Sequence, residues 1–123
     1  MDQALDRFGR IDCLINNAGI FVGNLAGFFH VTQRAIAQMV RQGTGHVVQI
    51  TTSLVDQADS KRPSALAALT KGGLAAVTRS LAIEYAARGV RVNAVALGVI
   101  KTPIYDPASY EGMSALHPLG RLG

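Results

Sequence analysis

Three short apolar runs, separated by longer segments of helical pattern, define the layout of this chain. The runs are "IDCLINNAG" (residues 11–19), "HVVQIT" (46–51) and "VRVNAVAL" (90–97). Runs of this length, rich in Ile, Val and Leu and bounded by turn residues, are typical of buried β-strands. We therefore predict three strands, each of which leads into a loop.

The two segments between these runs predict long helices. Residues 24–42 place four apolar side chains near helical spacing before "GTG", which is a typical helix end: Phe28, Ile36, Met39 and Val40. A second helix is expected over 64–88, started by Pro63 and capped by Gly89. The tail beyond residue 103 shows no clear periodicity, and no element is predicted there.

The alternation of strands and helices predicts an α/β fold with a parallel sheet that helices cover on both faces. The 123 residues suffice for one domain with its own core. Ligands of such sheets bind at the carboxyl ends of the strands. The segments expected there are small and polar, as a ligand close to the backbone requires: "NNAG", "TTS" and "GVIKT".

Composition narrows the class of protein. With 49% hydrophobic and 16% charged residues, the chain suits a globular domain. The net charge is +4, but the basic residues are scattered, so nucleic-acid binding is not expected. No apolar stretch approaches membrane-spanning length and the N-terminus does not resemble a signal peptide, so we expect no membrane partner and a cytoplasmic location.

The cysteine and histidine content predicts neither a disulfide nor a metal site. Cys13 is the one cysteine and lies within the first predicted strand, so we expect a buried, reduced thiol. His30 and His46 show no metal-ligand spacing.

Five motifs together resemble the short-chain dehydrogenase/reductase family. They are "NNAG" (16–19), "NLAGFFHVTQ" (24–33), "ITTS" (50–53), "LTKGGL" (69–74), and "VRVNAV" (90–95) leading into "GVIKTP" (98–103). Each motif is weak alone, but their shared order is specific. The resemblance implies that residues 1–123 form the central part of a partial Rossmann-type, doubly wound parallel sheet with two long helices. It also implies NAD or NADP as cofactor and a small carbonyl or alcohol substrate.

The same resemblance assigns roles to individual residues. By it Lys71 is the family's helix lysine, Asn24 its proton-relay asparagine and Ser53 its catalytic hydroxyl, with Thr52 as an open alternative. The cofactor-binding residues would be Asn17, Ala18, Gly19, Lys71, Ile100 and Thr102. Each polar residue also has a structural interpretation: Lys71 as a surface lysine with a packed stem, Ser53 as a partner of local backbone, and Asn24 as a helix cap.

The sequence also departs from the family pattern. The family's tyrosine belongs four positions before the lysine, where this chain has Ala67, and a methyl group donates no proton. No glycine-rich turn precedes "NNAG", Asn24 follows Gly19 by only five positions, and "ALG" (96–98) replaces the usual Pro-Gly. We therefore expect impaired or lost activity.

Another side chain could supply the missing proton. Tyr85 is eighteen positions beyond Ala67 on one predicted helix, or roughly 27 Å at the rise of an α-helix, which excludes it. Tyr105, Tyr110 and His117 lie in the tail, where the family builds a substrate lid. Each could swing inward, although a surface or packing role is simpler.

Two alternatives to an enzyme remain open. One is a non-catalytic assembly protein of the same ancestry, which would form a homo-oligomer through residues 24–42 and 64–88. A stripe of small and apolar residues on the second helix would suit such pairing: Leu69, Ala76, Leu81 and Ala82. The other alternative is a fragment of a longer family member.

Overall fold

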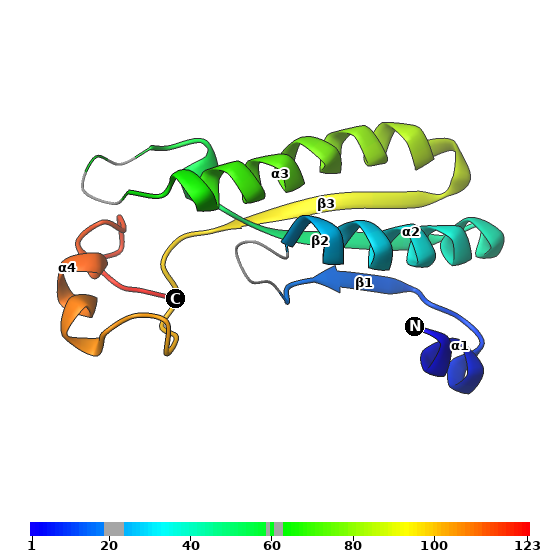
Figure 1. Cartoon of the computed structure of the whole chain (residues 1–123), viewed down its shortest axis with the longest axis horizontal. Coiled ribbons are helices and arrows are strands. Elements are labelled where there is room, and N and C mark those ends of the chain that lie inside the picture. Colours follow the sequence, from blue (N-terminus) through cyan, green and yellow to red (C-terminus); the bar gives the residue numbers. More distant parts are fainter. Residues whose placement is uncertain (19–23, 59, 61–62) are drawn as a thin grey trace.

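A computed structural model of the chain describes all residues except 19–23, 59 and 61–62. Its centre is a parallel three-stranded sheet in the order β1 (Cys13–Asn16), β2 (Gly45–Thr52) and β3 (Val90–Leu97) (Figure 1). Val47 of β2 pairs with Leu14 of β1 on one side and with Val92 of β3 on the other. The predicted parallel α/β sheet is therefore confirmed.

Two long helices lie against this sheet, α2 (Asn24–Gln42) and α3 (Ala65–Tyr85). The core cluster joins α2 to the inward side chains of β2 and β3: Ala35, Ile36, Met39, Val47, Val90 and Val92. Leu81 and Ala82 of α3 pack against the same cluster. Both long helices therefore lie on one face of the sheet.

The opposite face differs from the expectation of helices on both sides. Ile15 is 62% exposed and Val95 is 44% exposed, and both alternate with side chains that face the helices. Arg91 and Asn93 of β3 are exposed as well. No long helix of the described residues covers this face, which we call the uncovered sheet face.

Cys13 corrects one prediction, because its side chain is exposed rather than buried. β1 is an edge strand of four residues in which exposed and half-buried positions alternate. Leu14 packs against the core, so Cys13 points to the other side, which is the uncovered sheet face.

Glycines end both long helical segments as predicted. Gly43 follows α2 with φ 71°, and Gly89 follows the 3₁₀ turn η2 (Ala86–Arg88) with φ 74°. Both angles lie in the left-handed region that favours glycine. A Cβ on Gly89 would lie 2.1 Å from the Gly43 carbonyl oxygen, so the two turns pack directly on each other.

Short elements complete the chain where no periodicity was seen. They are α1 (Asp2–Phe8), the 3₁₀ turns η1 (Ser53–Val55) and η3 (Pro107–Ser109), and α4 (Tyr110–Ser114). The tail folds back beside the carboxyl end of β3, where the Val99 N–H donates to His117 Nε2 at 3.1 Å (Figure 1). Within the described residues, no helix is long and apolar enough to cross a membrane.

Candidate functional site

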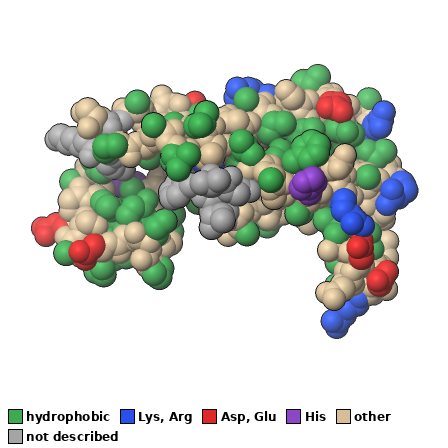
Figure 2. All heavy atoms as spheres, viewed as in Figure 1, with side chains coloured by type: hydrophobic (Ala, Val, Ile, Leu, Met, Phe, Trp, Pro, Cys, Tyr) green, Lys and Arg blue, Asp and Glu red, His purple; other side chains and the backbone are tan. Residues whose placement is uncertain are grey.

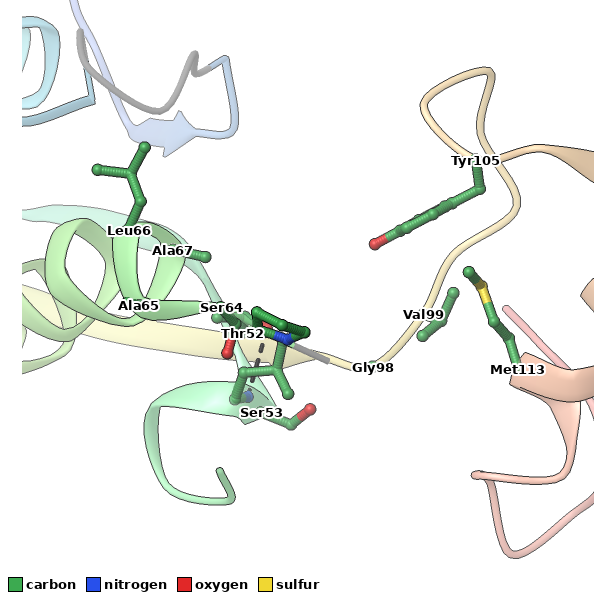
Figure 3. A pocket seen from close by; sticks show the side chains of 12 residues that line it. Thr52, Ser53, Ser64, Ala65, Leu66, Ala67, Gly98, Val99, Tyr105 and Met113 are labelled. Atoms are coloured by element: carbon green, nitrogen blue, oxygen red, sulfur yellow. Dashed lines mark hydrogen bonds between the residues drawn. The ribbon is translucent and has the colours of Figure 1, made fainter. Parts of the chain in front are cut away.

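A pocket of about 370 Å³ opens at the carboxyl ends of β2 and β3 (Figure 3). One wall is formed by the end of β2 and the first turn of α3, and the other by the loop after β3 and the tail. The lining residues are Thr52, Ser53, Leu54, Pro63, Ser64, Ala65, Leu66, Ala67, Gly98, Val99, Tyr105 and Met113. The position matches the expectation that ligands bind at the carboxyl edge of a parallel sheet.

Two neighbouring hydroxyls line this pocket, and the structure gives them different surroundings. The Thr52 hydroxyl accepts a hydrogen bond from the Leu54 N–H at 3.3 Å and so caps the η1 turn. The Ser53 side chain lines the same pocket. Thr52 is thus engaged with its own turn, and the choice between the two hydroxyls stays a prediction.

Ala67 lines the pocket from the first turns of α3, and Tyr105 enters from the opposite wall (Figure 3). The hydroxyl end of the Tyr105 ring points into the pocket, toward the wall that carries Ala67 and Thr52. The backbone N–H of Tyr105 donates to the Thr102 carbonyl at 3.2 Å, which fixes the turn that presents the ring.

The two other tail candidates are engaged elsewhere. The Tyr110 hydroxyl donates to the Thr102 carbonyl at 3.3 Å. His117 accepts from Val99 at Nε2, and its Nδ1 lies 3.2 Å from the Met113 carbonyl, to which it donates. Both side chains therefore hold the tail in place and do not line the pocket.

Lys71 lies one helical turn beyond Ala67 but lines a different pocket, of about 250 Å³, together with Asn17 and Ala18. Its ammonium donates to the Ile50 carbonyl at 2.6 Å. Partial burial without a carboxylate partner among the described residues lowers the pKa of Lys71 below its usual value. The structure thus brings Lys71, Asn17 and Ala18 together, and separately brings Ser53 and Ala67 together.

The remaining predicted residues line neither of the two pockets or lie outside the described part of the chain. Asn24 begins α2, but its side chain, like all of Gly19, lies outside the described residues. Ile100 and Thr102 are half-buried on the loop after β3, and neither lines the two pockets described above. Among the described residues, no group of three or more His, Cys, Asp and Glu side chains could hold a metal ion.

Sequence reasoning placed Val99 in the segment 98–102 at the ligand edge but gave it no role, and it did not identify Met113. Met113 lies in the five-residue helix α4, which is too short to show a periodic pattern, so it gave no sequence signal.

A third pocket, the interhelical groove, runs between α2 and α3 and has a volume of about 440 Å³. Its apolar lining includes Phe28, Phe29, Ile36, Val40, Val77 and Leu81. Phe29 is 56% exposed, and Figure 2 shows hydrophobic side chains gathered over the two helices. The predicted stripe on α3 is divided, because Leu81 and Ala82 pack on the core while Leu69 and Ala76 are exposed.

Comparison with known proteins gives a consistent result. The family model of the short chain dehydrogenases matches residues 1–111. The chain is 34% identical to the 3-oxoacyl-[acyl-carrier-protein] reductase FabG of Thermotoga maritima, with 100% of this chain and 57% of that protein aligned. It is 37% identical to the cis-4-hydroxycyclohexanecarboxylate dehydrogenase of Sinomonas cyclohexanicum, over 99% of this chain and 57% of that protein.

Among solved structures, ElxO with NADP bound is similar, with a TM-score of 0.88 and 27% identity over 99% of this chain and 58% of that chain. The chain thus spans less than two thirds of the length of these relatives. The alignment to FabG covers 144 positions for a chain of 123 residues, so the relative contains residues within this region that have no counterpart here.

Proposed function

Because the chain belongs to the short-chain dehydrogenase family, we propose that it catalyses NAD(P)-dependent interconversion of a carbonyl compound and an alcohol, at a reduced rate. The observation that carries this proposal is the pair of pockets at the carboxyl edge of the sheet. One presents Ser53 beside Ala67, and the other presents Lys71 beside Asn17. A hydroxyl and an ammonium at neighbouring ligand sites are the groups that a carbonyl reductase needs.

The second pocket suits one end of a nicotinamide dinucleotide. The Lys71 ammonium has three donors, one of which bonds the Ile50 carbonyl, so the others are available to ribose hydroxyls. A volume of about 250 Å³ is small for a ligand pocket and fits part of a dinucleotide rather than the whole. When bound there, the nicotinamide would supply the hydride. Lys71, Asn17 and Ala18 would hold it.

The first pocket would hold the carbonyl substrate. The Ser53 hydroxyl would donate to the substrate oxygen and orient it. Its largely apolar surroundings, which include Leu66, Val99 and Met113, favour a substrate with a hydrocarbon body. Ala67 offers no proton, and a positioned acid typically contributes a factor of about 10² to 10⁴. A donor from another part of the pocket would be less well placed than one on α3, which is the physical reason for the reduced rate.

Binding of the cofactor is the first test. A thermal melt with increasing NADH or NADPH should show a concentration-dependent rise, equivalent to about 2.7 kcal/mol at a hundred times the dissociation constant. Lys71→Met should abolish the rise, whereas Arg79→Met, which removes an exposed cation from the same helix outside both pockets, should preserve it. A cooperative melt that both cofactors leave unchanged would contradict the proposal.

Turnover is measured separately, as oxidation of NADH or NADPH with two ketone probes. One is a short 3-oxoacyl thioester and the other is 4-oxocyclohexanecarboxylate, which represent the substrate types in the names of the two relatives. We expect slow oxidation with at least one probe.

A second candidate function is assembly without catalysis. The interhelical groove favours it, because exposed Phe29 lines a groove between the two helices that are expected to pair with a second copy of the chain. The two candidates differ in outcome: an assembly protein would associate through this groove and leave both nicotinamide cofactors unbound.

A further inference from the structure

The ring of Tyr105 occupies the side of the first pocket that faces Ala67 (Figure 3). A large phenol and a methyl group therefore line one pocket from opposite walls. The space that the alanine leaves open is the space toward which the Tyr105 hydroxyl points. The pocket thus contains a phenol, although the phenol comes from the tail and not from α3.

The Tyr105 hydroxyl is also the available one. The other two candidates in the tail are already hydrogen-bonded. Tyr110 bonds the Thr102 carbonyl, and His117 bonds the backbone of Val99 and Met113. The Tyr105 hydroxyl has no such partner among the described residues, so it can donate to a ligand without breaking an internal hydrogen bond.

The tail that carries Tyr105 is fastened to the loop after β3. A Cβ on Gly98 would lie 2.6 Å from His117 Nε2, so the histidine ring packs directly on this backbone. The Gly123 N–H donates to the Val99 carbonyl at 3.2 Å, and the Lys101 N–H donates to the Gly123 carbonyl at 3.0 Å. These contacts hold His117 and the chain end against the loop that leads from β3 to Tyr105.

We propose that Tyr105 is the proton donor of this chain and replaces the acid that position 67 lacks. The inference rests on the proposed function. A bound reduced nicotinamide would supply hydride to the carbonyl carbon, so that a carbon–hydrogen bond forms and the π pair of the C=O bond moves to oxygen. Tyr105 would give its hydroxyl proton to that oxygen, which leaves the alcohol, the oxidised nicotinamide and a Tyr105 phenolate. The phenolate regains its proton from water, since Tyr105 is 37% exposed.

The kinetic test compares four proteins with the ketone probes and NADPH or NADH: the natural chain, Tyr105→Phe, Ala67→Tyr, and the double variant. We expect Tyr105→Phe to lower kcat at least 10²-fold with little change in the ketone KM, because a positioned acid contributes about 10² to 10⁴ to the chemical step. Ala67→Tyr should restore turnover in the Tyr105→Phe background. Tyr85→Phe, which removes the same hydroxyl at the far end of α3, should retain the natural rate.

The outcomes separate the inference from the proposed function. If Tyr105→Phe retains the natural kcat, Tyr105 is not the donor and the proposed function stands. If the natural chain is inactive but Ala67→Tyr is active, the site is correct and the donor assignment fails. If neither the natural chain nor Ala67→Tyr oxidises NADH or NADPH, and the thermal melts of both proteins ignore the cofactors, both proposals fail.

A spectroscopic test needs no turnover. The chain has three tyrosines, so labelling with ¹³Cζ-tyrosine gives three signals, which the single Tyr→Phe variants assign. Cyclohexanol is added in increasing concentration as a stand-in for the alcohol product. We expect the Tyr105 signal to move in a saturable way while the Tyr85 signal stays constant. A Tyr105 signal that does not respond would overturn the proposal, because the hydroxyl would then not reach a bound oxygen.

Discussion

Gln49 is a buried polar residue that lowers the stability of the fold that contains it. Its side chain is fully buried on the helix-covered face of β2, and neither Nε2 nor Oε1 has a hydrogen-bond partner among the described residues. An unsatisfied buried amide costs about 1–3 kcal/mol of stability. The inward position follows from the alternation of β2, but the missing partner depends on α2 and α3, which the sequence of one strand does not reveal.

Replacing this amide should stabilise the chain. Gln49→Met has similar volume and no polar atoms, so we expect the free energy of unfolding to rise by about 1–3 kcal/mol. Urea denaturation measures the change, with Gln57→Met at an exposed position as the matched control. A loss of stability in Gln49→Met alone would mean that the amide is satisfied in solution, for example by a bound water.

Residue by residue, the candidate site could be predicted only in part. The motifs located Ser53, Ala67 and Lys71 near the carboxyl edge of the sheet, because strand ends and helix starts are encoded locally. They did not separate Thr52 from Ser53, since the difference is a single hydrogen bond to the Leu54 N–H. They also did not choose among the three tail residues, because the path of an aperiodic tail is set by contacts such as that between His117 and Val99.

At the scale of elements, boundaries were predictable where glycine ends a helix. The range predicted for the first long helix is identical to α2, and Gly89 ends the second helical segment as expected. α1 and α4 were not foreseen, because helices of seven and five residues are too short to show the helical period. The helix-ending glycines therefore have a conformational role that substitution can test.

Gly89 and Gly43 form a matched pair for that test. Gly43→Ala places an alanine at φ 71° with open space around its Cβ, so we expect a loss of about 1–2 kcal/mol from the left-handed conformation alone. Gly89→Ala has the same backbone cost and adds a clash with the Gly43 carbonyl oxygen. We expect it to lose about 1–3 kcal/mol more. Equal urea midpoints for the two variants would show that the turns do not pack as described.

At the scale of the whole molecule, the sheet has two unlike faces. A continuous apolar strand pattern predicts helices on both faces, yet α2 and α3 share one of them. A signal was present in the third strand, where Arg91 and Asn93 alternate with the buried Val90 and Val92. Two polar side chains with a period of two indicate a face without a helix, although the alanines that follow weaken the pattern.

The proposed association of the chain should depend on one surface. Phe29→Glu places a charge on the interhelical groove, and we expect it to shift sedimentation from dimer to monomer. Val95→Glu makes the same change on the uncovered sheet face and should leave the dimer intact. Dissociation by Val95→Glu alone would assign the contact to the sheet face. A natural chain that sediments as a monomer at every concentration would exclude association.

The exposed edge strand β1 also provides a site for chemical labelling, which can show whether a partner covers the sheet. Cys13 is the one thiol of the sequence, and it is exposed on the uncovered sheet face. A maleimide dye will therefore attach at a single known atom. The labelling rate then measures how often that face is open: a partner that covers the sheet will slow the reaction, while a ligand confined to the Tyr105 pocket will leave it unchanged. One exposed sulfur atom thus distinguishes, without any mutation, a protein that binds at its strand ends from one that binds across its sheet.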